Sequence, residues 1–253
     1  MVYVASVSFG KDSLAMLLRL IEEDWPLDHV VFFDTGMEYQ AIYNNMEKIK
    51  PLLKEKGIKF RILKPKDPFL YNMLERDINA RDGRIKTGGR GWCGGAIRWG
   101  TSEKLSKIDS YYNELSRGYE TIVNYVGIAA DETERINRKR DELKVNIYPL
   151  IEWGMDEATC LQYCYDKGYD WSEEIVSDEG VQSVDLYKVL DRVSCWCCRN
   201  KTKDELYNMY LYLPNYWEKL KDLQRQIETP YKTYGTVFDI EKEFEARKIF
   251  TKQ

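Results

Sequence analysis

Six cysteines in a chain of 253 residues are the side chains whose chemistry most needs an explanation. Cys195 and Cys198 have C-x-x-C spacing with Cys197 between them, and one tight turn of that spacing can present two thiolates to a metal ion or an iron–sulfur cluster. Cys93 lies directly before an expected helix, whose N-terminal N–H groups would lower the pKa of its thiol. The pattern predicts a thiolate site, for which an iron–sulfur cluster, zinc, a redox disulfide and free thiols all remain open.

The remaining cysteines and the single histidine narrow the choice of chemistry. Cys160 and Cys164 share one face of an expected helix, which favours their burial as small apolar side chains. Because His29 is the one histidine, sites built from several histidines and Ser-His-Asp triads are excluded, apart from anything His29 itself does. Six cysteines are too few for a disulfide scaffold, no signal peptide opens the sequence, and no apolar run reaches the ~20 residues of a membrane span. We therefore expect a reduced, cytoplasmic protein with no membrane partner.

A second chemical motif occupies residues 8–13, between an expected strand and an expected helix. The first N–H groups of a helix have no partner within it, so an anion binds there. Gly10 allows the backbone to approach a phosphate closely, Ser8 and Ser13 add hydroxyl donors, and Lys11 adds a positive charge. Asp12 suits the first turn of a helix and could orient a metal ion or a donor. The net charge of −4 also indicates that any anionic ligand is held by such a local cluster.

The elements that must position these motifs follow from the apolar pattern. Short β-branched or apolar runs at 2–7, 30–33 and 60–63 predict strands, and helical spacing from residue 13 and over 38–55 predicts the helices between them. Strands that alternate with helices in this way predict a parallel sheet covered by helices on both faces.

Further along the chain the pattern is looser. Within residues 64–91, the basic, Gly-rich stretch 81–90 is expected to form a loop. The later elements are expected to be a strand at 121–126, helices over 96–108, 156–167 and 203–227, and a final short helix. We expect an α/β domain over residues 1–200, followed by an α-rich C-terminal extension over 201–253.

Four motifs, taken together and in order, resemble a known family. Residues 8–13 resemble the PP-loop of the N-type ATP pyrophosphatases, with Phe9 in place of the first glycine of that pattern. Residues 34–38 (Asp-Thr-Gly-Met-Glu), 127–135 and 148–153 are similar to motifs of the phosphoadenylyl-sulfate (PAPS) reductase family. The resemblance covers roughly residues 3–200.

The resemblance implies a doubly wound parallel sheet of the adenine nucleotide alpha hydrolase-like type, which binds its nucleotide at the carboxyl ends of the strands. The residues it places near the nucleotide are Ser8, Gly10, Lys11, Asp12, Ser13, Asp34, Thr35, Gly36, Glu38 and Gly127. It implies that Arg135 contacts the anionic leaving group or substrate, as a catalytic residue beside Lys11 and Asp12. Position 129 is alanine where the family often has arginine, and residues 138–140 are expected to be a solvated charged stretch.

The resemblance also implies a ligand set for the cysteines. The iron–sulfur branch of the family uses an adjacent cysteine pair and a later C-x-x-C, and here Trp92-Cys93 stands where the pair would be. The implied ligands are Cys93, Cys195 and Cys198, with Cys197 or no protein group as the fourth. Family members without a cluster attack the sulfonucleotide with a cysteine in the C-terminal tail, but no cysteine follows Cys198 here. Cys197 would have to serve as the nucleophile instead.

Three functions remain open at this point. In the first, ATP is cleaved between its α- and β-phosphates with Mg²⁺, an acceptor is adenylylated and sulfur displaces AMP. In the second, a sulfonucleotide (APS or PAPS) is reduced to sulfite. The third is a non-catalytic, zinc-stapled nucleotide-binding module of a larger complex, for which the basic loop 81–90 and nineteen tyrosines would suit nucleic acid, although the acidic net charge disfavours that partner. The first two functions imply a sulfur or electron donor protein as partner, and the sequence makes no prediction of oligomeric state.

Overall fold

The computed structural model describes residues 1–79, 83–136, 144–177 and 180–250. The chain forms two compact units that alternate along the sequence. The first, here called the sheet unit, comprises Met1–Asp34, Glu38–Lys64 and Glu103–Trp171. The second, the cysteine unit, comprises Thr35–Met37, Pro65–Ser102 and Ser172–Gln253. The expected division of the chain at residue 200 stays a prediction about which parts fold independently.

The sheet unit is built on five parallel strands in the order β3-β2-β1-β6-β7. These strands are β1 (Val2–Ser6), β2 (His29–Phe33), β3 (Lys59–Leu63), β6 (Ile122–Val126) and β7 (Lys144–Ile147). Chain order runs outward from β1 in both directions, which is the doubly wound arrangement. All five residues of β2 are buried, as expected for a parallel sheet with both faces covered. The predicted α/β fold with a parallel sheet is confirmed.

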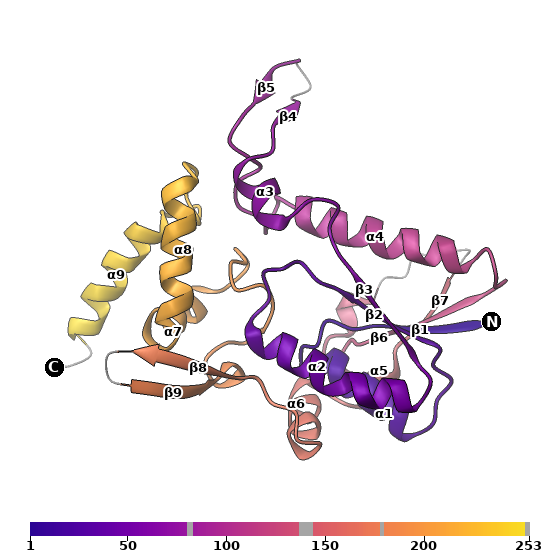
Figure 1. The fold of residues 1–253 in the computed structure, drawn as a ribbon. Coiled ribbons are helices and arrows are strands. Elements are labelled where there is room, and N and C mark those ends of the chain that lie inside the picture. The colour runs from indigo at the N-terminus through magenta and orange to yellow at the C-terminus, as the bar shows by residue number, and fades with distance from the viewer. Residues whose placement is uncertain (80–82, 137–143, 178–179, 251–253) are drawn as a thin grey trace. The chain divides into compact units, whose positions relative to one another are not determined.

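Helices cover both faces of this sheet, as Figure 1 shows. They are α1 (Lys11–Glu22), α2 (Gln40–Glu55), α4 (Trp99–Leu115), α5 (Pro149–Glu152) and α6 (Glu157–Asp166). Tyr111 and Tyr112 of α4 pack against Val2, Val4 and Ile122 of the strands. On the opposite face, α1 packs against α5 and α6. Most residues of the three central strands β1, β2 and β6 are therefore buried, which stabilises the unit chiefly through apolar burial.

His29 has a structural role in this packing. It is buried in β2, and its Nδ1 lies 2.6 Å from the hydroxyl oxygen of Tyr111. Burial lowers the pKa of His29, because a charged imidazole would be desolvated there. The one histidine of the chain thus belongs to the contact between the sheet and α4.

The cysteine unit is α-rich toward its C-terminus. It contains α3 (Phe69–Leu74), α7 (Lys203–Tyr212), α8 (Pro214–Gln226) and α9 (Val237–Phe250), together with two hairpins, β4–β5 (Ile78–Asn79, Ile85–Lys86) and β8–β9 (Ser172–Ser177, Gly180–Asp185). Thr202 caps α7 by accepting a hydrogen bond from the backbone of Glu205, whose carboxylate accepts one from the backbone of Thr202. The C-terminal helical region agrees with the sequence-based expectation.

Several element boundaries differ from the sequence-based prediction. The helix expected over 203–227 is two helices, because Pro214 lacks an N–H and occupies the first turn of a new helix. Helix α3 and the β4–β5 hairpin were not anticipated, and strand β5 lies within the stretch 81–90 that was expected to be a loop. Helix α4 starts at Trp99 and continues to Leu115. Strand β7 and the β8–β9 hairpin were not anticipated. No helix in the described part of the chain is long and apolar enough to cross a membrane.

Candidate functional site

The loop that leads into α1 is folded around the hydroxyl of Ser13. The Ser13 Oγ accepts a hydrogen bond from the backbone N–H of Ser8 at 3.1 Å and donates to the carbonyl of Gly10 at 3.2 Å. The hydroxyls of Ser8 and Ser13 are also 3.1 Å apart. Gly10 is the N-cap of α1, and no side chain caps this helix end. The first turn of α1 therefore presents its N–H groups in the loop, as an anion site requires.

The surroundings of Phe9 show how this loop accommodates a phenylalanine where the related pattern has a glycine. Its φ of 59° lies in the left-handed region, which costs a bulky residue roughly 1–2 kcal/mol. Its ring is fully buried and lies edge-on to Phe32 at 5.1 Å and to Phe60 at 6.0 Å. The indole N–H of Trp171 donates to the Phe9 carbonyl at 2.8 Å, which fixes the strained peptide. Apolar burial and this hydrogen bond offset the backbone strain.

Gly127, at the end of β6, packs directly on the loop. A Cβ at this position would lie 2.9 Å from the Cα of Ser13 and 3.2 Å from its backbone nitrogen. These are backbone atoms of the first turn of α1 and cannot move without moving the helix. Only a residue without a side chain fits, so Gly127 lies where the sequence placed it, beside the anion loop.

Lys11 is buried at the start of α1 and is surrounded by carboxylates. Its side chain is 8% exposed, and its Nζ lies 2.5 Å from the Oε2 of Glu157 and 3.8 Å from the Oδ1 of Asp12. Glu157 is the first residue of α6, and its backbone N–H donates to Asp131 at 3.2 Å. Sequence analysis missed Glu157, because nothing in its local pattern distinguishes it from any acidic residue in the first turn of a helix.

Asp12 is the most electrostatically perturbed carboxyl of this cluster. Burial raises its pKa to about 6 and outweighs the opposing effect of Lys11, while Glu157 and Glu132 raise the pKa further. Glu132 is itself buried and pairs with Arg135, whose side chain is partly exposed. The predicted catalytic residues Lys11, Asp12 and Arg135 therefore belong to one charged cluster in the sheet unit.

The motif at 34–38 is shared between the two units. Asp34 follows β2 and accepts a hydrogen bond from the Tyr43 hydroxyl at 2.8 Å, and the pKa of Tyr43 is raised by burial and then by Asp34, with Glu38 adding to the effect. Lys64 Nζ lies 3.8 Å from the second oxygen of Asp34. Asp34 and Glu38 thus belong to the sheet unit, and their place beside a nucleotide stays a prediction.

The middle of that motif touches the C-x-x-C. The Thr35 hydroxyl lies 3.5 Å from the Cys195 sulfur, and the carbonyl of Met37 accepts from the backbone N–H of Trp196 at 3.0 Å. Gly36, between them, has φ of 76° and is exposed. Thr35 and Gly36 were expected beside the nucleotide, and the structure places them in the cysteine unit beside Cys195.

The cysteine turn and the Cys93 segment pack against each other. The N–H of Cys198 donates to the carbonyl of Cys195 at 3.1 Å, which closes the turn. A Cβ on Gly94 would lie 2.9 Å from the Cβ of Arg199, and the N–H of Gly95 donates to the side chain of Asn200 at 2.7 Å. Two segments about a hundred residues apart in sequence are thereby brought together, as the spacing argument required.

The thiol of Cys93 behaves differently from the expectation. The N–H groups of Gly100 and Thr101, at the start of α4, do favour its thiolate. Burial outweighs them and raises the pKa of Cys93, and the neighbouring Cys198 adds to that rise. The expectation of a lowered pKa is therefore wrong for this state of the protein, although the helix effect on which it rested is present.

Buried cations accompany the cysteine turn. Lys201 is 4% exposed; burial lowers its pKa, and Glu205 followed by Cys198 and the other two thiols of the turn opposes that shift. Lys232 is half-buried, and burial likewise lowers its pKa against the influence of Cys198. Positive charge beside thiols favours thiolates, the form that binds metals. Neither lysine was singled out from the sequence, since their contribution depends on tertiary contacts.

The remaining cysteines take distinct places. Cys197 is 2% exposed, so its proposed role as a nucleophile or fourth ligand would act inside the protein core. Cys160 and Cys164 are fully buried on α6, which confirms their prediction as packing residues, and burial raises the pKa of Cys160 to about 12. Among the described residues, no group of three or more His, Cys, Asp or Glu side chains is close enough to hold a metal ion.

The expected solvated charged stretch at residues 138–140 lies outside the described part of the chain.

The geometry defines a class of protein. A doubly wound parallel sheet with an anion loop at the start of its first helix is the architecture of the adenine nucleotide alpha hydrolase-like proteins. The chain matches the model of the phosphoadenosine phosphosulfate reductase domain over residues 2–173, and it belongs to that family. Its members typically are enzymes and bind adenine nucleotides.

A curated relative is an uncharacterized protein of Methanocaldococcus jannaschii, which is 23% identical over 239 residues. The match covers 88% of this chain and 41% of the relative, so the chain spans about two-fifths of the length of that protein.

Replacing Gly127 by alanine tests the contact between β6 and the loop. The added methyl group would push the first turn of α1 out of place, so we expect a loss of about 1–3 kcal/mol of unfolding free energy and at least tenfold weaker nucleotide binding. Urea unfolding and calorimetric titration with an ATP analogue measure the two effects. Gly118→Ala is the matched control, because the nearest atom to its Cβ would be a carbonyl oxygen at 3.8 Å. Equal behaviour of the two variants would contradict the proposed contact.

The raised pKa of Asp12 predicts a dependence of stability on pH. Its pKa is about 6 in the folded protein against an ordinary value of 3.8, so the folded state favours the protonated carboxyl. The resulting stability is fully present below pH 3.8 and is lost as the pH rises through about 6. Relative to Asp12→Asn, the unmodified protein should lose on the order of 3 kcal/mol over that range, as measured by urea unfolding in the presence of EDTA. The exposed Asp77→Asn should show no such trend, and a constant difference between protein and D12N at pH 4 and pH 7.5 would refute the assignment.

Proposed function

We propose that this protein binds an adenine nucleotide with its anionic end in the loop at residues 8–13, and that it cleaves ATP between the α- and β-phosphates to activate an acceptor for sulfur transfer. One observation carries the proposal: a buried lysine, Lys11, stands in the first turn of α1 above a loop shaped by Gly10 and Ser13. A buried ammonium at a helix N-terminus binds a phosphate more strongly than an exposed one, because the low local dielectric strengthens the attraction.

The carboxylates around Lys11 suit the exchange that nucleotide binding requires. In the free protein Glu157 neutralises the Lys11 ammonium, and a β- or γ-phosphate would take over this role. Mg²⁺ usually binds through one or two carboxylates together with substrate phosphates. Asp12 is buried and has a raised pKa, and a cation bound beside it would stabilise its ionised form and lower that pKa.

The reaction then follows from the charges that develop. An oxygen of the acceptor attacks the α-phosphorus, the bond between the α- and β-phosphates breaks, and pyrophosphate leaves. Lys11 and the N–H groups of the α1 turn stabilise that departing charge, and Arg135, which is partly exposed at the edge of the cluster, contacts the outer phosphate. A sulfur nucleophile from a donor protein would finally displace AMP from the activated acceptor.

The thiol site would serve the sulfur half of this chemistry. Cys93, Cys195 and Cys198 would hold an iron–sulfur cluster, with Cys197 or no protein group as the fourth ligand. The donor set fits in kind, because two thiols share one turn, the Cys93 segment packs on that turn, and Lys201 and Lys232 supply positive charge. It does not fit in distance, because no three thiols among the described residues are close enough to hold a metal ion. A bound cluster would supply iron that can carry sulfide or transfer electrons. Zinc fits the same thiols and would act as a structural staple.

A second candidate is the reduction of APS or PAPS to sulfite. The family to which the chain belongs supports it, since that family is described by this substrate, and the same loop would hold a sulfate or a phosphate. A third candidate, a zinc-stapled nucleotide-binding module, is supported by the deep burial of Cys197 and by the length of the relative beyond the matched region.

Replacing Lys11 by alanine should abolish nucleotide binding and leave the protein folded. We expect at least a hundredfold rise in Kd for α,β-methylene ATP by calorimetry, with an unchanged circular dichroism spectrum. Lys104→Ala, on the surface of α4, is the control for the loss of one positive charge. Comparison of α,β-methylene ATP with APS separates the two reactions, because the tighter ligand identifies the substrate. Unchanged affinity of K11A for both ligands would refute the loop assignment.

Metal analysis and a visible spectrum after anaerobic purification test the thiol site. A brown protein with bound iron, whose colour is lost in Cys195→Ser and Cys198→Ser and retained in Cys160→Ala, is the expected result. A colourless protein with stoichiometric zinc would favour the non-catalytic module. If neither metal is bound, or if the cysteine variants retain iron, the proposed ligand set is wrong.

A further inference from the structure

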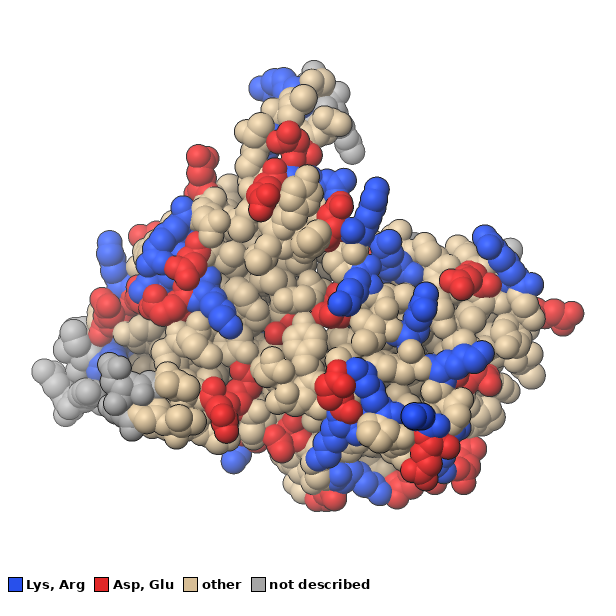
Figure 2. All heavy atoms as spheres, viewed as in Figure 1, with Lys and Arg blue, Asp and Glu red and all other residues tan. Residues whose placement is uncertain are grey.

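One cavity of the cysteine unit is lined mainly by cations among its charged residues, although the protein has a net charge of −4. The face drawn in Figure 2 carries lysine and arginine as well as aspartate and glutamate side chains. The cavity has a volume of about 610 Å³. Its charged lining residues are four cations, Lys86, Arg90, Arg199 and Lys232, and one carboxylate, Glu228.

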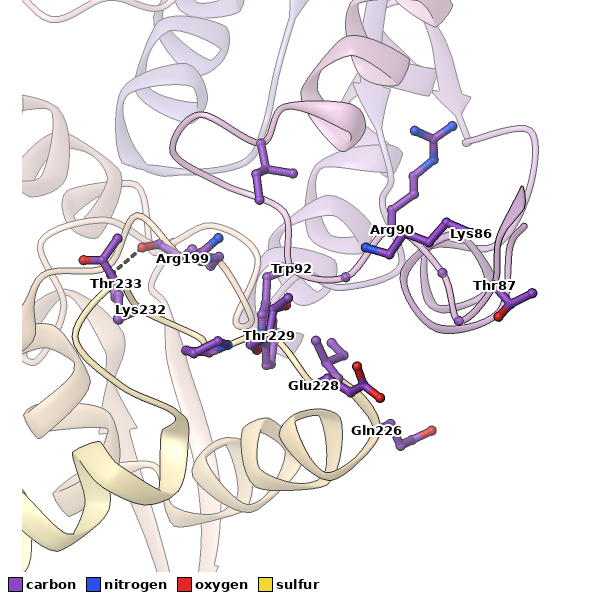
Figure 3. A pocket seen from close by; sticks show the side chains of 16 residues that line it. Lys86, Thr87, Arg90, Trp92, Arg199, Gln226, Glu228, Thr229, Lys232 and Thr233 are labelled. Carbon is purple, nitrogen blue, oxygen red and sulfur yellow. Dashed lines mark hydrogen bonds between the residues drawn. The ribbon is translucent and has the colours of Figure 1, made fainter. Parts of the chain in front are cut away.

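Two segments form opposite walls of this cavity, as Figure 3 shows. One wall is the Gly-rich loop that carries Lys86, Thr87 and Arg90, and the other carries Arg199, Lys232 and Thr233. The volume lies within the range of small-molecule sites, roughly 300–1,000 Å³.

The Gly-rich wall is held in place by α3. The backbone N–H groups of Arg90 and Gly91 donate to the carbonyls of Asn72 and Met73, each at 2.9 Å. Gly88 and Gly89 have φ of 84° and 76°, and a Cβ on Gly89 would lie 2.2 Å from the Met73 carbonyl oxygen. Any side chain at position 89 would therefore collide with the backbone of α3. The conformation of this wall is fixed before any ligand binds.

The opposite wall is organised by Gln224, a buried residue of α8. Its side-chain N–H groups donate to the carbonyls of Ile227 and Thr229 at 2.7 and 3.1 Å, and its oxygen accepts from the N–H groups of Tyr231 and Val237 at 3.1 and 3.2 Å. One side chain thus fixes the turn between α8 and α9.

The floor of the cavity joins this wall to the cysteine turn. Trp92 donates from its indole N–H to the Thr229 carbonyl at 3.0 Å and lies edge-on to Tyr231 at 4.8 Å. The Tyr231 hydroxyl donates to the carbonyl of Cys198 at 2.6 Å. Lys232 Nζ donates to the carbonyls of Arg199 and Lys201. Two lining residues, Trp92 and Arg199, are also the immediate sequence neighbours of Cys93 and Cys198.

We propose that this cavity is a second anion site, which binds the phosphate group of a ligand other than the nucleotide at residues 8–13. An excess of positive charge in a partly enclosed cavity suits a doubly charged phosphate better than a single carboxylate. Lys86 and Arg90 bind the phosphate from the Gly-rich wall, and Arg199 from the wall beside the cysteines. Lys232, whose Nζ is held by two backbone carbonyls, adds positive charge to that wall. The site does not depend on nucleotide binding at residues 8–13, because all its residues lie in the cysteine unit and that loop lies in the sheet unit. A phosphorylated small molecule and the backbone of a nucleic-acid strand share this chemistry.

Binding of two probes tests the site and separates these sources. The probes are thymidine 5′-monophosphate, followed by calorimetry, and a short fluorescein-labelled oligothymidylate, followed by anisotropy. The double variant Lys86→Ala/Arg90→Ala should weaken binding of at least one probe tenfold or more. For the oligonucleotide, it should also reduce the slope of log Kd against log salt by about 1–2. Lys242→Ala/Lys248→Ala on α9 removes two charges elsewhere in the cysteine unit and should change neither.

The outcomes are distinct. Loss of monophosphate binding in K86A/R90A indicates a phosphorylated small molecule, and loss of oligonucleotide binding alone indicates a strand. Either result supports the site if Lys11→Ala leaves the affinity within twofold. Binding that is lost in K11A and kept in K86A/R90A would place the ligand at α1 and overturn the proposal, as would absence of binding of both probes at millimolar concentration. Because K11A is also the test of nucleotide binding, failure of one site is distinguishable from failure of the other.

Discussion

The packing of one backbone segment against another, without a side chain between them, governs the candidate nucleotide site. Strands β1 and β6 run parallel and in register from Val2 opposite Ile122 to Ser6 opposite Val126. Both strands end at the same edge of the sheet, so the loop after β1 and the segment after β6 lie close together. Because Gly127 has no side chain, the first turn of α1 can lie directly against the end of β6. The direction of α1, the position of Lys11 and the cluster around it all depend on this contact.

Sequence patterns were sufficient for four of the five strands of the sheet and for the loop that follows its central strand. Continuous apolar runs predicted β1, β2, β3 and β6, because strands buried on both faces leave little room for polar residues. Residues 8–13 could be read locally, since a glycine, two serines and a lysine before a helix have a direct physical meaning. By contrast, β7 and the β8–β9 hairpin carry few continuous apolar residues, and Val145, Val176 and Val181 are exposed. Their strand character comes from pairing partners, which a single sequence does not display.

The site residues that sequence analysis missed are those whose role arises from tertiary contacts. Glu157 matters because α6 packs on α1, and Trp171 because its indole reaches the Phe9 carbonyl. Nothing in the neighbourhood of either residue along the chain indicates this. The pKa of Cys93 is a further example. The lowering effect of the helix N-terminus could be inferred from the sequence, because Cys93 directly precedes an expected helix, but the larger raising effect of burial could not. Sequence patterns thus identified the candidate site residues, but the tertiary contacts that set their pKa values are visible only in the structure.

Position 9 also has a consequence for how this loop can change over generations. A glycine there would remove the strain of the left-handed backbone, but it would also leave a cavity between Phe32 and Phe60. The free-energy cost of that cavity is greater than the cost of the strain. Replacement of Phe9 by the glycine of the related pattern is therefore unfavourable unless the surrounding aromatic residues change with it. The rings that pack on Phe9 thus retain a large side chain at a position whose backbone conformation glycine would adopt more easily.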